Sequence, residues 1–346
     1  MDLMDKLKKS HTWILTGCAG FIGSNILEQL LKSDQFVLGI DNFSTGFKKN
    51  LEHVHKIVGD KKWQNFKFLN IDLRDFSKVR DEIISNSTFD IKNYDYFLHQ
   101  AAIGSVPRSI EDPLFSHTNN VNGFISALEV ARELKIKTFV YASSSSVYGD
   151  EETLPKIEKL IGKPLSPYAT TKYINEIYAE TYSLVYGMNT IGLRYFNVFG
   201  PRQDPSGPYA AVIPKWINSF MKHEGITING DGKTTRDFCF VENVVNANLL
   251  SALISKDYVF SKVFNIAYGT QTSLNELSDF IINNLKEMGI QSNFLVEYGD
   301  FRDGDIRHSL ADISEAQSFL GYSPKIDPKT GLQKSLKWYV EQHSKI

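Results

Sequence analysis

The stretch GCAGFIG, residues 17–23, decides the fold, because an apolar segment precedes it and an amphipathic segment follows. WILT, residues 13–16, is typical of a short buried strand, and apolar residues recur at helical spacing within residues 24–33. Glycines at such a junction allow a tight turn and close backbone approach, and the helix N-terminus binds anions. The pattern therefore predicts a dinucleotide site whose contacts include Gly17, Gly20, Phe21, Ile22 and Gly23.

Further strands and helices alternate along the first 200 residues. The strands are expected at residues 13–16, 36–41, 65–73, 94–102, 138–146 and 189–200. The helices are expected after 24, up to about 63, through 76–86, through 113–134 and from about 168. This alternation predicts an α/β fold with a Rossmann-like, doubly wound parallel sheet. Polar residues at the carboxyl ends of such strands meet in one crevice, and here they are Asp41, Asp72, Gln100, Ser144 and Asn197.

Shorter structural units follow residue 200. We expect residues 1–200 to form the dinucleotide-binding domain, with returning segments at about 240–270. Residues 201–346 are expected to form mainly a smaller C-terminal α/β lobe that binds the substrate.

Composition narrows the functional classes. The 346 residues carry a formal net charge of −2, from 38 basic and 40 acidic residues, which gives no support for nucleic-acid or membrane-surface binding. The sequence contains no run of about 18 apolar residues, so it does not predict a membrane span. Two cysteines, Cys18 and Cys239, without a Cys/His cluster predict no metal site and favour a reducing, cytoplasmic location.

Asp41 ends the second predicted strand. A carboxylate there can accept both hydrogen bonds of an adenosine ribose, whereas it would repel a 2′-phosphate. No arginine follows directly, so NAD is favoured over NADP, and the alternative is that Asp41 only caps a turn. Asp72 is a candidate for the adenine amino group or, alternatively, a helix N-cap.

Tyr168 and Lys172 form a YxxxK pair on one face of a predicted helix. A free phenol has a pKa of about 10, so forming the phenolate at neutral pH costs roughly 4 kcal/mol. A nearby ammonium and a positive nicotinamide ring favour the anion, which then serves as a general base. Residues 143–146 are four serines at a strand end, where a hydroxyl can relay a proton or simply bind backbone groups.

Taken together, GCAGFIG, the ID at 40–41, HQAA at 99–102, SSSSVYG at 143–149, YATTK at 168–172 and RYFNVFGPR at 194–202 resemble extended short-chain dehydrogenases/reductases. Within these the chain is most similar to UDP-hexose 4-epimerases, in particular the UDP-N-acetylglucosamine 4-epimerase subgroup. The resemblance covers nearly the whole chain after the first dozen residues. It implies a cytoplasmic, homodimeric, NAD-dependent isomerase that inverts C4 of a UDP-sugar through a 4-keto intermediate, as in polysaccharide biosynthesis.

The resemblance also implies the site residues. Tyr168, Lys172 and Ser144 are the expected catalytic residues, with Ser143 and Ser145 as alternatives for the serine. The further cofactor contacts it implies are Asn42, Leu73, Gln100, Ala101, Ala102 and Tyr195. The substrate contacts it implies are Gly104, Ser105, Val106, Ser109, Ser144, Ser145, Asn197, Gln203, Ala211, Val212, Asn229, Arg236, Gln271, Arg302, Asp305 and Ser309. Core packing is an equal alternative for Val212, Ile213 and Trp216.

Ser309 bears on the size of the sugar. In the family this position is a gate beside the C2 substituent, where tyrosine excludes an N-acetyl group and serine leaves room. We therefore expect UDP-GlcNAc and UDP-GalNAc as substrates ahead of UDP-glucose and UDP-galactose.

Other activities of the same scaffold remain open. A UDP-glucuronate 4-epimerase or decarboxylase would need a cation for the sugar carboxylate, and Arg108 or Arg307 could serve. A 4,6-dehydratase is disfavoured because serines stand where that class has its Asp-Glu pair. A non-catalytic NAD-binding protein would have no need of Tyr168 and Lys172.

Overall fold

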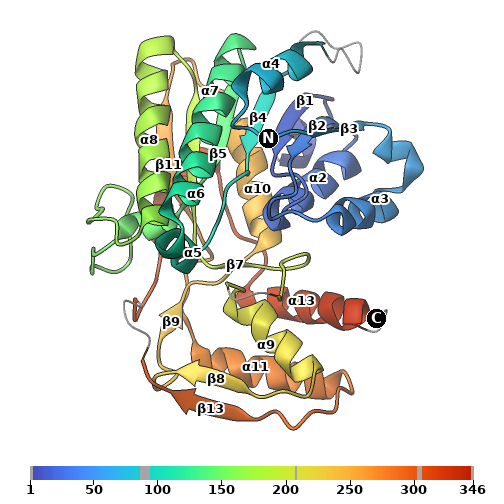
Figure 1. Ribbon diagram of the computed structural model, residues 1–346, viewed down its shortest axis with the longest axis vertical. Coiled ribbons are helices and arrows are strands. Elements are labelled where there is room, and N and C mark those ends of the chain that lie inside the picture. Colours follow the sequence, from blue (N-terminus) through green and yellow to red (C-terminus); the bar gives the residue numbers. More distant parts are fainter. Residues whose placement is uncertain (1–2, 86–93, 207–208, 302–305, 344–346) are drawn as a thin grey trace.

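Seven parallel strands form the central sheet, in the order β11-β6-β5-β4-β1-β2-β3 (Figure 1). The structure is a computed structural model that describes residues 3–85, 94–206, 209–301 and 306–343. The strands are β1 (Thr12–Thr16), β2 (Phe36–Asp41), β3 (Phe66–Asn70), β4 (Tyr96–His99), β5 (Thr138–Ser144), β6 (Thr190–Tyr195) and β11 (Ser261–Ile266). The predicted α/β, Rossmann-like fold is confirmed.

Both faces of the sheet are buried, which explains why its strands are almost continuously apolar. Along β1, Trp13 and Leu15 belong to one core cluster, whereas Ile14 between them belongs to another. Successive side chains of a strand point to opposite faces, so a fully apolar strand supplies both cores.

Helices cover the two faces. One core includes residues of α2 (Phe21–Lys32), α3 (Lys48–Trp63), α10 (Val241–Ala252) and α12 (Ser314–Leu320). The other includes residues of α4 (Phe76–Ser85), α7 (Gly123–Glu133) and α8 (Pro167–Tyr186). Among the described residues, no helix combines the length and apolar character that a membrane crossing requires.

The predicted helix over 113–134 is interrupted. It consists of α6 (Pro113–His117), a π-helical turn η1 (Thr118–Asn122) and α7. Inside η1, the Asn120 amide donates to the carbonyl of Ile103 at 3.0 Å and accepts from its N–H at 2.7 Å. This side chain therefore ties the helix to the loop after β4. The short helix α5 (Val106–Glu111) precedes α6, and α1 (Leu3–Lys6) precedes β1.

A smaller unit lies below the sheet in Figure 1 and has its own core. Its elements are α9 (Val212–Met221), β8 (Ile226–Asn229), α11 (Leu274–Glu287), β13 (Val296–Gly299) and α13 (Pro328–His343). Short strand pairs lie between the units: β7 (Val198–Phe199) with β10 (Cys239–Phe240), and β9 (Thr235–Arg236) with β12 (Thr272–Ser273). Residues of α10 and β11 join the larger unit, as does α12, which packs against β11.

Candidate active site

The glycine loop packs too closely for side chains at two positions. A Cβ on Gly23 would lie 2.0 Å from the carbonyl oxygen of Gly17, and a Cβ on Gly17 would lie 2.7 Å from the nitrogen of Ala101. Gly17 also has a φ of +69°. The N-terminus of α2 has no side-chain cap, so its N–H groups can bind a pyrophosphate.

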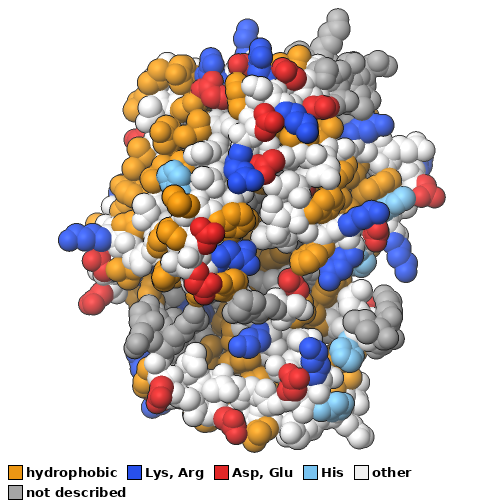
Figure 2. All heavy atoms as spheres, viewed as in Figure 1, with side chains coloured by type: hydrophobic (Ala, Val, Ile, Leu, Met, Phe, Trp, Pro, Cys, Tyr) orange, Lys and Arg blue, Asp and Glu red, His pale blue; other side chains and the backbone are white. Residues whose placement is uncertain are grey.

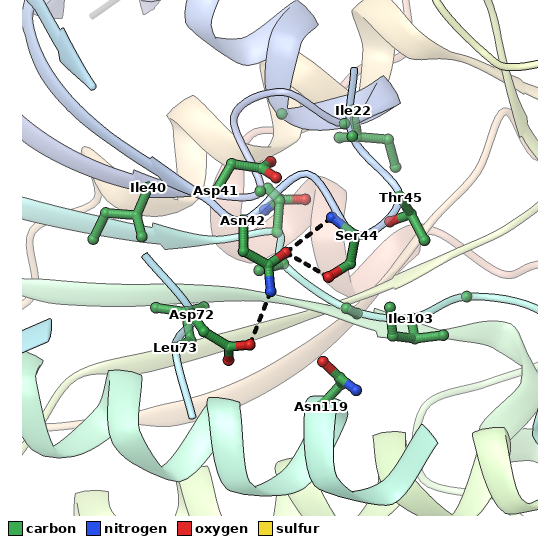
Figure 3. A pocket seen from close by; sticks show the side chains of 18 of the residues that line it. Ile22, Ile40, Asp41, Asn42, Ser44, Thr45, Asp72, Leu73, Ile103 and Asn119 are labelled. Carbon is green, nitrogen blue, oxygen red and sulfur yellow. Dashed lines mark hydrogen bonds between the residues drawn. The ribbon is translucent and has the colours of Figure 1, made fainter. Parts of the chain in front are cut away.

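A cavity of about 340 Å³ opens beside this loop, at the carboxyl ends of β1 and β2 (Figure 3). Twelve predicted cofactor residues line it: Gly17, Gly20, Phe21, Ile22, Gly23, Asp41, Asn42, Asp72, Leu73, Gln100, Ala101 and Ala102. Gly104, predicted as a substrate contact, lines this same cavity.

The buried Asp41 carboxylate holds the surrounding loops. It accepts hydrogen bonds from the N–H groups of Ala19 at 2.9 Å and Phe43 at 2.8 Å. Burial raises the pKa of Asp41, and these backbone donors oppose the rise. The side chain therefore closes a turn, as the alternative interpretation had it, while also lining the cavity.

Asp72 belongs to a polar chain across the cavity wall (Figure 3). It accepts a hydrogen bond from the Asn42 amide at 3.1 Å and two from the Arg74 guanidinium at 2.9 and 2.6 Å. The hydrogen bonds from Arg74 lower the pKa of Asp72. Asp72 is not the N-cap of α4, because Asp75 accepts the N–H of Lys78 there.

Several residues of this cavity were not predicted from the sequence. They are Ile40, Ser44, Thr45, Gly46, Ile71, Arg74, Ile103 and Asn119. Ser44 to Gly46 lie three to five residues after Asp41, so the polar STG sequence was an available signal. Asn119 had none, because it lies in the π-helical turn that the apolar pattern did not reveal.

Helix α8 presents Tyr168 and Lys172. Its start is fixed twice: the Ser166 hydroxyl accepts the N–H of Ala169 at 3.2 Å, and the Ser109 hydroxyl accepts the N–H of Tyr168 at 3.0 Å. Ser109, a predicted substrate contact, is fully buried and thus supports the helix.

Lys172 is only 2% exposed. Its ammonium donates to the carbonyl of Ala142 at 2.8 Å and lies 5.9 Å from the ring centroid of Tyr168. Burial lowers the pKa of Lys172 to about 8, although Glu176 acts in the opposite direction. Burial raises the pKa of Tyr168, and the interaction with the Ser144 side chain partly opposes this rise.

The serines at the end of β5 have different environments. Ser143 donates to the Glu176 carboxylate at 2.5 Å, and Ser144 interacts with Tyr168 and with Ser146. Ser145 lines a second cavity. Of the three candidates for proton relay, Ser144 is therefore the one whose side chain interacts with the tyrosine.

Tyr195, at the end of β6, bonds to two side chains from other elements. Its hydroxyl donates to Gln100 at 2.9 Å and accepts from the buried Asn248 amide at 2.9 Å. Gln100 in turn donates to Asn248 at 2.9 Å. Since Gln100 lines the cofactor cavity, Tyr195 reaches that cavity through this network.

The second cavity, of about 540 Å³, lies between the two units. The predicted substrate residues that line it are Val106, Ser145, Asn197, Arg236 and Ser309. Lys156, Tyr148 and His308 also line it and were missed. Lys156 is 5% exposed, and burial lowers its pKa. Nothing in its local sequence pointed to the site, because a long-range bridge to Ala311 brings it there.

Other predicted substrate residues have structural contacts of their own. Ser105 caps α5, Gln203 donates to the carbonyl of Val198, and Gln271 donates to the hydroxyl of Thr235. Ala211 directly precedes α9, Val212 begins it, and Asn229 ends β8. Ile213 and Trp216 are buried in the core. Arg302 and Asp305 lie outside the described residues.

Comparison with known proteins decides the family. Residues 13–267 match the NAD dependent epimerase/dehydratase family. The chain belongs to this family. A Methanocaldococcus jannaschii protein that carries a provisional UDP-glucose 4-epimerase name is 38% identical over 326 residues, which are 94% of this chain and 97% of that protein.

Two solved structures of epimerases are similar throughout. The UDP-N-acetylglucosamine 4-epimerase from Methanobrevibacter ruminantium, in complex with UDP-N-acetylmuramic acid, is 37% identical with a TM-score of 0.85, covering 96% of this chain and 99% of that one. The UDP-glucuronic acid 4-epimerase from Bacillus cereus, with UDP-glucuronic acid and NAD, is 29% identical with a TM-score of 0.80, over the same shares.

NAD is the cofactor of this epimerase/dehydratase family member. The residues present fit NAD. The uncapped start of α2 suits the pyrophosphate, and because Gly17 and Gly23 have no side chains, only backbone atoms would lie next to the pyrophosphate there. When bound, NAD⁺ supplies a hydride acceptor and a positive ring. Among the described residues, no group of three His, Cys, Asp or Glu side chains could hold a metal ion.

Proposed function

We propose that this protein is a UDP-sugar 4-epimerase that interconverts UDP-N-acetylglucosamine and UDP-N-acetylgalactosamine, with UDP-glucose and UDP-galactose as further candidate substrates. The observation that carries the proposal is the grouping of three side chains: the buried Lys172 ammonium lies 5.9 Å from the ring centroid of Tyr168, and Ser144 interacts with the same tyrosine. The similar epimerases support the same reaction class.

In the proposed reaction, Tyr168 takes the proton of the sugar 4-hydroxyl, and Ser144 hydrogen-bonds the same oxygen and relays the proton. Lys172 stabilises the resulting phenolate, because its ammonium lies one helical turn away. The hydrogen on C4 would leave as hydride to bound NAD⁺ and return from it, so that the sugar passes through a 4-keto form. Turning of this 4-keto sugar about its diphosphate presents the opposite face. The proton then returns from Tyr168, and C4 is inverted. Arg236 is proposed to bind the diphosphate.

The N-acetyl preference rests on Ser309. Its small side chain lines the larger cavity, and its backbone N–H is held by the carbonyl of Thr235 at 3.2 Å. A serine fixed in this way leaves space for an N-acetyl group, which agrees with the similarity to the Methanobrevibacter enzyme.

UDP-glucuronate is the second candidate substrate. Arg108 stacks over Tyr209 and Arg307 pairs with Asp231 at 2.7 Å, and neither lines the larger cavity. Lys156 does line it, and this buried cation favours a substrate with a carboxylate. The similarity to the Bacillus cereus enzyme, solved with UDP-glucuronic acid, supports this candidate substrate.

A panel of four UDP-sugars tests the substrate assignment. Purified protein is incubated separately with UDP-GlcNAc, UDP-GalNAc, UDP-glucose and UDP-glucuronate, and the products are separated by chromatography. The proposal expects interconversion of the two N-acetyl sugars. Consumption of UDP-glucuronate without any UDP-GalNAc from UDP-GlcNAc would transfer the assignment to the second candidate.

We also propose a cytoplasmic homodimer formed through α8 and α6. Exposed apolar side chains support this face: Leu114, Ile177, Leu184, Val185 and Tyr186. Figure 2 shows hydrophobic atoms gathered along the edge where Figure 1 places α8. Large apolar side chains exposed together on one face favour association with a second copy.

A further inference from the structure

Glu176 is a buried carboxylate, 7% exposed, that lies one helical turn after Lys172 on α8. One of its oxygens accepts the Ser143 hydroxyl at 2.5 Å and the Arg194 Nε at 2.9 Å. The other accepts the Arg194 Nη2 at 2.7 Å. Three hydrogen bonds from two side chains, Ser143 on β5 and Arg194 on β6, therefore converge on this one carboxylate of α8.

These partners are the immediate neighbours of the candidate catalytic residues. In the register of β5 and β6, Ser143 faces Arg194, and the next pair is Ser144 and Tyr195. The carbonyl that receives the Lys172 ammonium belongs to Ala142, directly before Ser143. Glu176 thus fixes α8 against the ends of β5 and β6. These two strand ends carry Ser144, the candidate for proton relay, and Tyr195, a predicted cofactor contact.

Titratable groups on β4, β5, β6 and α8 lie around Lys172 and Glu176. His99 on β4 stays neutral, because burial lowers its pKa to about 3, and burial keeps the Tyr141 phenol on β5 neutral by raising its pKa. Arg194 on β6 carries a like charge. Glu176 is the carboxylate that opposes the desolvation of the Lys172 ammonium.

We propose that Glu176 is a positioning residue for catalysis, whose buried carboxylate keeps Lys172 charged and holds Ser143 and Arg194 in register with Tyr168. This rests on the proposed function, because it takes Lys172⁺ to be the form that stabilises the phenolate. The same carboxylate therefore sets the pH range over which the lysine remains protonated.

The test is the pH profile of kcat/KM for epimerisation by the NAD-loaded enzyme. In Glu176→Gln, the basic limb is expected to move to lower pH by about one pH unit, because an opposite charge has been removed. The matched control is Glu158→Gln. Glu158 is also a poorly exposed carboxylate beside Arg194, but its side chain binds the N–H of Asn265. Its basic limb should stay at the wild-type position.

A second variant guards against poor folding, since Glu176→Gln leaves the Arg194 charge buried without its carboxylate. The double variant Glu176→Gln with Arg194→Met removes both charges. Its basic limb is expected to move in the same direction by a smaller amount, because a like charge has been removed together with the opposite one. The proposal is overturned if the basic limb is unchanged in the folded Glu176 variants, or if the control shows an equal shift. It is also overturned if neither Glu176 variant folds, since Glu176 would then be a purely structural residue.

Lys172→Met separates this inference from the proposed function. Full activity of that variant would remove the lysine from the mechanism altogether. A variant that retains NAD but has lost activity, together with an unshifted limb in Glu176→Gln, would overturn the role of Glu176 alone.

Discussion

Gly23 has the tightest backbone contact of the cofactor loop. A methyl group there would meet the carbonyl oxygen of Gly17 at 2.0 Å, so Gly23→Ala must displace the loop. We expect this variant to be purified with much less NAD, and its free energy of unfolding to fall by about 1–3 kcal/mol. The NAD content of the denatured protein, read by absorbance, measures the first effect.

Gly123→Ala is the matched control for that prediction. Its added methyl would meet only the Cβ of Leu73 at 3.6 Å, an ordinary contact within helix α7. Normal NAD content in both variants would show that close packing of the glycine loop is not needed for the cofactor.

Tyr168 is the general base of the proposed mechanism. Tyr168→Phe removes one hydroxyl, so the turnover number should fall by about 10²–10⁴-fold, the usual contribution of a general base. The fold and the NAD content should be unchanged, which circular dichroism and absorbance will check. Turnover at the wild-type rate would exclude Tyr168 as the base.

The activity of the wild-type enzyme should fall at alkaline pH because of Lys172. Burial lowers the pKa of this ammonium to about 8, so its charge is present below that pH and is lost above it. We therefore expect kcat/KM to decline as the pH rises through about 8. A profile that stays flat to pH 10 would mean that the protonated lysine is not required.

Single residues also show how far the sequence predicts the site. The glycine loop and Asp41 line one cavity, and the sequence could bring them together because a strand, a turn and a helix define their positions locally. Lys156 and Arg74 were missed for different reasons. Lys156 reaches its cavity through a bridge to Ala311, and Arg74 reaches the other cavity through pairing with Asp72. Neither contact follows from the periodic spacing of apolar residues that predicts helices and strands.

At the scale of elements, the start of α8 determines where Tyr168 lies. Ser166→Ala removes the hydroxyl that accepts the N–H of Ala169, and loss of such a cap costs about 1 kcal/mol of stability. Because Tyr168 lies two residues further on, turnover should also fall. Chemical denaturation and steady-state kinetics measure the two effects.

Ser273→Ala is the control at this scale. Ser273 caps α11 in a capping box with Glu276, in the smaller unit. It should lose similar stability without a change in turnover. If Ser166→Ala loses stability but keeps its full turnover, the cap does not position the tyrosine.

Elements with strong periodicity were predicted well, including β1, β2 and α2. The predicted helix over 113–134 was correct in extent but not in form, because apolar spacing is insensitive to a single wide turn. That turn, η1, exists where Asn120 binds the backbone of Ile103, and this contact joins residues far apart in the sequence. Tertiary hydrogen bonds of this kind are not visible in a local pattern.

At the scale of the whole molecule, association is the property that the exposed face of α8 predicts. Leu184 is 80% exposed, so Leu184→Glu should leave the fold unchanged but convert a dimer to a monomer. Leu295→Glu is the control, because Leu295 is also exposed but lies beside β13, away from α8. Sedimentation velocity reads the mass. A wild-type protein that sediments as a monomer would contradict the proposed dimer.

In the proposed function, both units hold one UDP-sugar in the larger cavity, and C4 is inverted with the same hydrogen removed and returned. The most direct measurement uses UDP-GlcNAc labelled with deuterium at C4, with NMR and mass analysis of the products. We predict UDP-GalNAc that retains deuterium at C4, with no net formation of NADH. Loss of the label to solvent, or a product with unchanged C4, would contradict the proposed mechanism.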